Sequence, residues 1–312
     1  MSIRIFFIKR KNKIVDKIIF LLYNSLKTKE YLGEKNMAYP RILTVQDISC
    51  VGQCSLTAAI PVVSACGVEC CPIPSAVLST HTAGFKEFTF KDLTDDIPLI
   101  NKHWVSEGLT FDAIYTGYLG SAKQIECVEK LMNSVLKKDG VSVIDPAMAD
   151  NGKLYVGFDM NFVAEMKKLC SKANYLVPNI TEASLLTGIE YKTEYDRDYI
   201  NSLLTALTEL GCKNVVLTGV SYEPSTTGVV VFENGKYSYY KHEKIERGCH
   251  GTGDIYASAF VGALMRGKSA FDAAKIAADF TLDCIKETLD EPEHWYGVKF
   301  EPVLGNLISY LK

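Results

Sequence analysis

Short apolar runs alternate with amphipathic stretches along the chain from residue 41 onward. The apolar runs predict β-strands over residues 42–45, 70–77, 113–116, 141–144, 175–177 and 214–218. Apolar residues at helical spacing predict helices over about 55–66, 121–138, 181–187, 196–210 and 251–264. This alternation is typical of a mostly parallel central sheet with helices on both faces. The sequence therefore predicts an α/β protein with three layers.

One stretch departs from the alternation and predicts an antiparallel hairpin. Residues 227–240 hold two extended segments on either side of Glu233-Asn234-Gly235, a turn sequence between apolar runs. We expect this hairpin at the edge of the parallel sheet. No repeat, low-complexity tract or linker rich in Pro, Gly and Ser divides residues 41–312. Residues 37–312 are therefore expected to form a single domain.

The first 36 residues differ from the rest in charge. They carry nine lysines and arginines against three acidic residues, a net charge of +6, which leaves −9 for residues 37–312. Because residues 37–312 are this acidic, they are a poor candidate for binding nucleic acid. The apolar run 18–23 is far shorter than the roughly 20 residues that span a bilayer, and no signal-peptide cleavage site follows it.

Three interpretations of this leader remain open: a basic membrane-surface segment, a disordered arm, or an upstream start whose true initiator is Met37. We favour the last, because an orderly strand pattern begins only at Arg41. We expect residues 1–36 to play no part in function and the protein to have no membrane partner.

The ten cysteines raise the question of disulfides. Several lie in apolar or helical surroundings: Cys66, Cys70, Cys71, Cys170, Cys212 and Cys284. Because no convincing export signal is present, we expect buried reduced thiols in a cytoplasmic protein. Cys70 and Cys71 are adjacent, which is not the spacing of a zinc site, so no metal is assigned to the cysteines.

Residues 248–254, Gly-Cys-His-Gly-Thr-Gly-Asp, lead directly into a predicted buried helix. Gly251 and Gly253 around Thr252 let the backbone turn sharply, so that free N–H groups point to one place, where the helix dipole adds positive charge. This predicts an anion cradle. Asp254 would compete with a permanent anion, but it suits a general base beside a transient one. The structural alternative is a glycine turn with an acidic first helical turn, which is common.

Acidic and amide side chains follow two of the predicted strands. Asp145 leaves strand 141–144 just before a proline, and Asn179 and Glu182 follow strand 175–177. Ligands collect at the carboxyl ends of parallel strands, so Asp145 and Glu182 are candidates to hold Mg²⁺ through water beside nucleotide phosphates. The spacing of Asn179 and Glu182 also fits a capping box, which is a structural role. No Walker sequence is present, which excludes the P-loop class.

Polar residues after the first three strands predict the other half of a pocket. They are Gln46-Asp47, Ser79-Thr80-His81-Thr82-Ala83-Gly84 and Thr116-Gly117-Tyr118-Leu119-Gly120-Ser121. Short hydrogen-bonding side chains, one imidazole and one aromatic ring suit a small polar heteroaromatic substrate. Considered alone, His81 could be a structural histidine, and Tyr118 could be a core residue.

Taken together and in this order, these motifs resemble the ribokinase-like superfamily. The resemblance rests on Gly251-Thr252-Gly253-Asp254 at a helix start, Asp145-Pro146 after a strand, and Asn179-x-x-Glu182. More narrowly, Ser79-Thr80-His81-Thr82, the segment from Thr116 to Ser121, and Val177-Pro178-Asn179 are similar to the pyridoxal kinases, including bacterial pyridoxamine kinases. The resemblance covers about residues 40–312.

The resemblance implies a three-layer ribokinase-like fold and a cytoplasmic, ATP-dependent enzyme. Its reaction would be phosphorylation of the 5'-hydroxymethyl group of a vitamin B6 vitamer (pyridoxal, pyridoxamine or pyridoxine) in salvage of pyridoxal phosphate. The implied catalytic residue is Asp254, and the anion hole is Gly251, Thr252 and Gly253. The implied substrate-binding residues are Asp47, Thr80, His81, Thr82 and Tyr118. The implied Mg·ATP residues are Asp145, Asn179, Glu182, Thr218 and Gly219, with Mg²⁺ on Asp145 and Glu182. A monovalent cation such as K⁺ and a homodimer are also expected.

Two residues depart from the pyridoxal kinase pattern. Asp47 stands where many of these enzymes have a serine that meets the pyridine ring, which favours a more basic substrate such as pyridoxamine. His250 precedes the glycines as in the hydroxymethylpyrimidine kinases of thiamine synthesis, although those typically have cysteine in place of Asp254. The main alternative is therefore such a pyrimidine kinase, followed by a sugar kinase. A catalytically inactive sensor with the same fold is a further alternative, against which the retained Asp254 and glycines argue.

Overall fold

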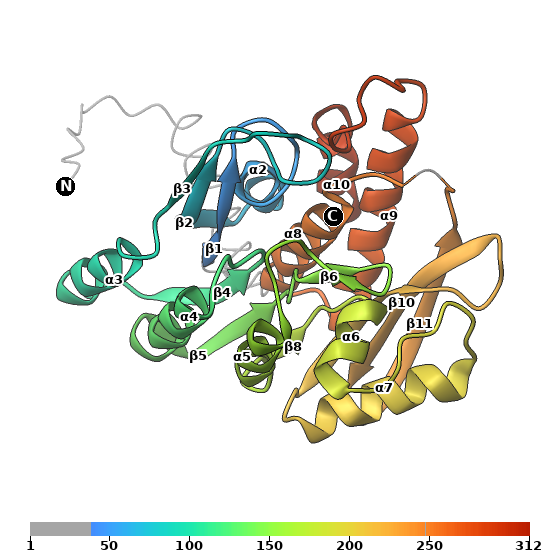
Figure 1. Cartoon of the computed structure of the whole chain (residues 1–312), viewed down its shortest axis with the longest axis horizontal. Coiled ribbons are helices and arrows are strands. Elements are labelled where there is room, and N and C mark those ends of the chain that lie inside the picture. Colours follow the sequence, from blue (N-terminus) through green and yellow to red (C-terminus); the bar gives the residue numbers. More distant parts are fainter. Residues whose placement is uncertain (1–38, 247) are drawn as a thin grey trace, which may run out of the picture. The chain divides into compact units, whose positions relative to one another are not determined.

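A computed structural model describes residues 39–246 and 248–312; the leader predicted over residues 1–36 lies outside the described residues. Within them, nine strands form one sheet in the order β11-β10-β9-β8-β5-β4-β1-β2-β3 (Figure 1). Their bounds are β1 Arg41–Ser49, β2 Glu69–Leu78, β3 Phe90–Asp92, β4 Phe111–Thr116, β5 Leu136–Ile144, β8 Tyr175–Leu176, β9 Asn214–Val220, β10 Thr226–Glu233 and β11 Lys236–Glu243. A separate small hairpin pairs β6 (Ala149–Asp150) with β7 (Lys153–Leu154).

The centre of the sheet is parallel and its edges are antiparallel. The pairs β1–β2, β1–β4, β4–β5, β5–β8 and β8–β9 are parallel. The strand β10 pairs antiparallel with β9 and β11, and β3 pairs antiparallel with β2. Asn234 and Gly235, with φ of 53° and 76°, form the two-residue turn between β10 and β11, as the turn sequence predicts. The mostly parallel sheet and the edge hairpin are therefore confirmed.

Helices cover both faces of the sheet. Their bounds are α2 Leu56–Ala65, α3 Ile97–Ser106, α4 Ala122–Ser134, α5 Met160–Cys170, α6 Ile180–Thr187, α7 Arg197–Glu209, α8 Thr252–Met265, α9 Ala270–Thr288 and α10 Leu304–Tyr310, with a 3₁₀ turn at Glu301–Val303. Figure 1 shows the helices around the sheet. One apolar cluster joins α2, α8, α9 and α10 to the sheet, and a second cluster joins the helices α3, α4, α5, α6 and α7 to it. In β4, Ile114 belongs to the second cluster and Tyr115 to the first, because successive strand residues face opposite sides.

Some local predictions were incomplete or wrong. The helix predicted to end at 138 ends at Ser134, and β5 begins at Leu136 rather than at 141. The first half of β5 is largely exposed and carries Lys137 and Lys138, so it lacks the apolar run that marks a buried strand. Cys66, Cys170, Cys212 and Cys284 are buried as expected, whereas Cys70 and Cys71 are only half-buried.

Candidate active site

A cavity of about 560 Å³ lies at the carboxyl ends of the parallel strands. It is lined by nearly all of the residues that the sequence singles out: Asp47, His81, Thr82, Tyr118, Asp145, Asn179, Glu182, Thr218, Gly219, Gly251, Thr252, Gly253 and Asp254. Thr80 is the exception, because it does not line the cavity, and its hydroxyl is buried without a hydrogen-bond partner in the described part of the chain. Segments far apart in the sequence therefore meet at one place.

The start of α8 has the geometry of an anion cradle. Gly251 caps the helix in the left-handed conformation, with φ 78° and ψ 0°. The first intrahelical bond runs from the N–H of Ile255 to the carbonyl of Gly251, so the N–H groups of Thr252, Gly253 and Asp254 precede the helical ladder. A Cβ built on Gly253 would meet no atom within 4 Å, so open space adjoins these groups. Such a helix start binds phosphate well.

The cradle packs against the loop that precedes α2. A Cβ on Gly251 would lie 2.1 Å from the carbonyl oxygen of Gln53, so only glycine allows this approach. The Gln53 side chain in turn donates to both oxygens of Glu301 at 2.9 Å and contacts His294 at 2.6 Å. The cradle is thus supported by the loop before α2 and by the C-terminal segment.

Asp254, in the first turn of α8, lines the cavity next to this cradle. Burial raises the pKa of its carboxyl to about 7; a hydrogen bond from the Ser55 backbone opposes the rise, and the charge of Asp47 adds to it. A carboxyl group that titrates near pH 7 can accept a proton from a substrate under neutral conditions. The position and the pKa of Asp254 therefore suit a general base.

Asp47, near the end of β1, is the second buried carboxyl group of the cavity. Its two oxygens accept hydrogen bonds from the hydroxyls of Ser55 at 2.5 Å and Ser49 at 2.9 Å. Burial raises the pKa of Asp47, and the two hydroxyls oppose that rise. The serines hold the carboxyl group in a fixed orientation beside the cavity.

His81 forms part of the wall with both ring nitrogens already engaged. Its Nδ1 accepts a hydrogen bond from the N–H of Ala83 at 3.1 Å, so Nδ1 carries no proton. Its Nε2 lies 2.7 Å from the carbonyl oxygen of Tyr296 and is therefore the donor. His81 is thus the neutral Nε2–H tautomer, and it offers ring carbons rather than a free nitrogen to a substrate. The ring also packs against His250 and Phe85, at centroid distances of 5.4 and 5.0 Å.

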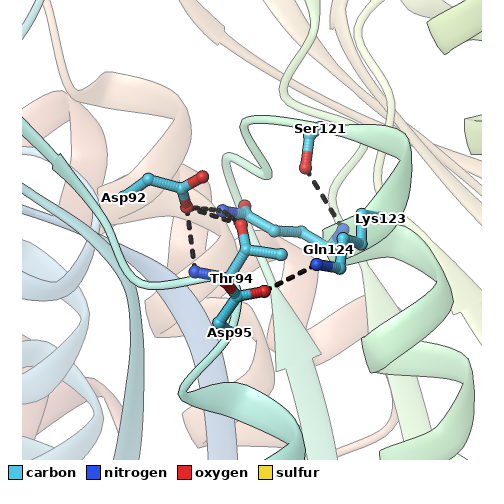
Figure 2. Close-up of polar contacts among 6 residues, drawn as sticks. All are labelled: Asp92, Thr94, Asp95, Ser121, Lys123 and Gln124. Carbon is cyan, nitrogen blue, oxygen red and sulfur yellow. Dashed lines mark hydrogen bonds and ion pairs between the residues drawn. The ribbon is translucent and has the colours of Figure 1, made fainter.

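Tyr118 lies in the loop between β4 and α4, and a polar network fixes that loop. The Gln124 side chain accepts from the N–H of Gly120 at 2.7 Å. It also donates to Thr94 at 2.9 Å, which ties α4 to the segment after β3 (Figure 2). The ring of Tyr118 stacks on Phe158, with centroids 5.3 Å apart and planes at 29°. The aromatic surface beside Asp47 is therefore held from two sides.

Asp145 and Glu182 form the acidic end of the cavity. Burial raises the pKa of Asp145 well above its usual range, and the charges of Glu182 and Asp254 raise it further. Burial likewise raises the pKa of Glu182, against the effect of backbone N–H groups that donate to its carboxyl. A bound cation would relieve this repulsion, and hard carboxylate oxygens are the ligands that Mg²⁺ prefers.

The composition of the cavity wall is also compatible with a bound cation at Asp145 and Glu182. No described residue that lines the cavity is a lysine or an arginine. No group of three or more His, Cys, Asp and Glu side chains in the described ranges could hold a metal ion alone. The donor set thus suits a cation that keeps several waters and bridges to phosphates, rather than a metal enclosed by protein.

The far end of the cavity was not predicted from sequence. It is formed by residues of β10, β11 and α9: Thr227, Gly228, Val229, His242, Ala278, Thr281 and Ile285. Ser49, Cys54, Ser55 and Tyr155 are further lining residues that the sequence analysis missed. The β10 and α9 residues sit in ordinary apolar patterns, so their sequence carries no signal that separates a cavity wall from core. Ser55 lies at the expected start of a helix, which conceals its role.

No helix in the described part of the chain is long and apolar enough to span a bilayer. Comparison with known proteins identifies relatives. Residues 51–298 match the model of the phosphomethylpyrimidine kinase family. A pyridoxal kinase of Dictyostelium discoideum is 28% identical over 244 residues, which are 73% of this chain and 79% of that protein.

Two solved structures share the fold. One is a Bacteroides thetaiotaomicron protein assigned to the phosphomethylpyrimidine kinases and crystallised with pyridoxal; it is 38% identical, with a TM-score of 0.82 over 86% of this chain and 96% of that one. The other is a pyridoxal kinase from Lactobacillus plantarum, 30% identical, with a TM-score of 0.80 over 87% of this chain and 98% of that one.

Proposed function

This chain belongs to the phosphomethylpyrimidine kinase family, within the ribokinase-like superfamily, and we propose that it transfers the γ-phosphoryl group of ATP to the 5'-hydroxymethyl group of a vitamin B6 vitamer. Its similarity to pyridoxal kinases supports this choice of acceptor. So does its similarity to a protein crystallised with pyridoxal. The product would be the 5'-phosphate of the vitamer.

One observation carries the proposal. A buried carboxyl group with a pKa of about 7, Asp254, adjoins an N–H cradle in a cavity that Asp47 and Tyr118 also line. A pyridine ring against Tyr118, with its ring substituents toward Asp47, brings a hydroxymethyl group toward Asp254. The cavity volume of about 560 Å³ suits a small aromatic acceptor rather than a polymer.

The chain's own residues account for the steps of the transfer. Asp254 accepts the proton of the hydroxymethyl group as the oxygen bonds to the γ-phosphorus and the bond to the β-phosphate oxygen breaks, which releases ADP. The N–H groups of Thr252 and Gly253 donate to the phosphoryl oxygens as negative charge moves between them. Asn179, Thr218 and Gly219 line the same cavity and would orient the remainder of the nucleotide. The reaction is therefore mainly one of positioning and charge stabilisation.

Asp145 and Glu182 would hold Mg²⁺, and a monovalent cation such as K⁺ would add to the neutralisation of the phosphates. When bound, Mg²⁺ would supply charge neutralisation to the nucleotide phosphates. The two carboxyl groups would contribute the negative charge that attracts the cation through its water shell.

A hydroxymethylpyrimidine kinase of thiamine synthesis is the second candidate, because the matching family is named for phosphomethylpyrimidine and His250 precedes the cradle. An ATP-consumption assay of the full chain with pyridoxal, pyridoxamine, pyridoxine and hydroxymethylpyrimidine separates the two. We expect the highest kcat/KM with a B6 vitamer. Faster turnover of hydroxymethylpyrimidine than of all three vitamers would replace the first proposal by the second.

A further inference from the structure

Ser55 has a backbone conformation that serine rarely adopts. It lies between β1 and α2, at the N-cap of α2, with φ 50° and ψ −133°. It is also buried, with 5% of its surface exposed. A positive φ in a residue other than glycine is sterically unfavourable, and such strain persists only where surrounding contacts impose it.

The Ser55 hydroxyl does not do what a serine at this position usually does. An N-cap serine normally accepts a hydrogen bond from the second or third N–H of its helix. Ser121 and Ser269 do so at the starts of α4 and α9, but Ser55 makes no such bond at α2. Its hydroxyl instead donates to Oδ1 of Asp47 at 2.5 Å. The hydroxyl therefore serves Asp47 rather than the helix.

The backbone N–H of the same residue faces the other carboxyl group of the cavity. Its effect lowers the pKa of the Asp254 carboxyl group against the effect of burial, and both residues line the cavity. The same loop, through the carbonyl of Gln53, packs directly on Gly251 of the cradle. Ser55 thus bonds to Asp47 through its side chain, and its backbone N–H acts on the pKa of Asp254 in the same cavity.

We propose that Ser55 is a positioning residue for phosphoryl transfer: Asp47 holds its hydroxyl, this bond keeps the strained backbone in place, and the N–H then orients Asp254. The inference rests on the proposed role of Asp254 as the base. It gives Asp47 a second task besides contact with the substrate, since the bond that orients the base is anchored on Asp47. It also explains why Ser55, at the N-cap of α2, makes no capping hydrogen bond to that helix.

Two substitutions separate the backbone effect from the loss of a hydroxyl. Ser55→Gly removes the hydroxyl but accepts a positive φ, whereas Ser55→Ala removes it and keeps the steric strain. We expect kcat to fall about tenfold in Ser55→Gly and further in Ser55→Ala, because small displacements of catalytic groups are costly. KM for ATP should change by less than about twofold, since the ground-state contacts of the nucleotide are kept.

The matched control is Ser269→Ala, which removes a serine that does cap its helix and lies outside the cavity. Its kcat should stay at the wild-type value. A thermal melt of each variant verifies folding, and Ser55→Gly keeps the test open if Ser55→Ala does not fold. Unchanged kcat in a folded Ser55→Gly variant would overturn the proposal. Equal losses in both Ser55 variants would also overturn it, because only the hydroxyl would then matter.

A double-mutant cycle with Asp47→Ala tests the chain of contacts. If Ser55 acts through its bond to Asp47, Ser55→Gly should lower kcat by less than about twofold once Asp47 is alanine. A full tenfold loss in that background would show that the two residues act independently and would contradict the proposal.

Crystal structures of the wild type and of Ser55→Ala provide a readout that needs no activity. We expect the Asp254 carboxyl group to move away from the N–H of residue 55 in the variant, and an unmoved Asp254 would overturn the proposal. A wild-type enzyme that phosphorylates none of the four acceptors would refute the proposed function but leave this structural result intact. The two failures are therefore distinguishable.

Discussion

The Asn179 side chain accepts a hydrogen bond from the Glu182 N–H at 2.9 Å, and the Glu182 carboxyl group accepts one from the Asn179 N–H at 2.9 Å. This reciprocal pair is the capping box that the spacing of the two residues allows. The second oxygen of Glu182 accepts from the N–H of Met148 at 3.0 Å, which fastens the loop after Asp145. Glu182 therefore has a structural role as well as a place at the acidic end of the cavity.

Glu182→Gln separates these two roles. Glutamine can also close a capping box, so the substitution removes the charge and keeps the helix start, while its amide NH2 no longer accepts from the N–H of Met148. We expect the Mg²⁺ concentration for half-maximal activity to rise by about tenfold, with little change in KM for the acceptor. A Mg²⁺ titration of the steady-state rate measures this, with Glu126→Gln on the exposed face of α4 as the control. An unchanged Mg²⁺ titration would show that Glu182 acts only as part of the helix cap.

Asp254 and Asp145 could be found from the sequence because each follows a pattern tied to a backbone event. A glycine pair opens a helix before Asp254, and a buried strand ends at a proline after Asp145. The topology then brings them together, since the carboxyl ends of parallel strands share one edge. The central strands were predictable for the same reason, because burial on both faces leaves continuous apolar runs.

Ser55, Thr80 and β5 show where local patterns fail. The role of Ser55 depends on its φ and on Asp47, which lies eight residues away in another element. Thr80 sits in a motif of cavity residues, yet its own hydroxyl does not reach the cavity. The exposed start of β5 has no apolar alternation, so only pairing with β4 identifies it as a strand. These features arise from tertiary contacts, which one sequence does not display.

Gly253→Ala should raise stability while lowering activity. A Cβ at Gly253 meets no atom within 4 Å, and alanine stabilises a helix by up to about 1 kcal/mol relative to glycine. If phosphate binds in that open space, the methyl group displaces it, and we expect kcat/KM for ATP to fall by more than tenfold. Thermal melts and steady-state kinetics on one preparation measure both effects. Wild-type kinetics in the stabilised variant would contradict the binding of phosphate at the start of α8.

The pH dependence of kcat/KM should report Asp254. Burial raises its pKa from 3.8 to about 7, so the carboxyl group is largely protonated at pH 6 and ionised at pH 8. A general base acts in its ionised form, so kcat/KM should rise with pH and level off above about 7. The residual activity of Asp254→Asn should lack this inflection. A wild-type profile that is flat between pH 5 and 8 would contradict the assignment.

Asp47→Ser should shift the preference of the enzyme from pyridoxamine toward pyridoxal. The substitution removes an anion that favours the substrate's amine, and it also removes the acceptor of the Ser55 hydroxyl. We therefore expect kcat to fall for both vitamers, and the informative quantity is the ratio of their kcat/KM values. Ser49→Ala, which removes one donor to Asp47 but keeps its charge, should leave that ratio unchanged. An equal loss with both vitamers would show that Asp47 does not select between them.

Asp254→Asn distinguishes catalysis from helix stabilisation by two effects of opposite sign. The substitution keeps the helix start and the glycine cradle but removes the base, so kcat should fall by about 10²- to 10⁴-fold while ATP still binds. Because the folded-state pKa lies above the unfolded value of 3.8, ionisation of Asp254 lowers the stability of the wild type as pH rises from about 4 to 7. The variant should therefore be more stable than the wild type at pH 8, by a few kcal/mol at most, and equally stable at pH 4.

The competing interpretation of Asp254, a favourable charge at a helix N-terminus, reverses both expectations. It predicts a loss of at most about 1 kcal/mol in stability and nearly normal turnover. Denaturant unfolding at pH 4 and 8, with kcat and nucleotide affinity measured on the same folded variant, decides between them. If the variant kept more than about a tenth of the wild-type kcat, Asp254 would not be the base, since general-base catalysis contributes at least about 10²-fold. Its burial beside the cradle would then need a role in binding rather than in proton transfer.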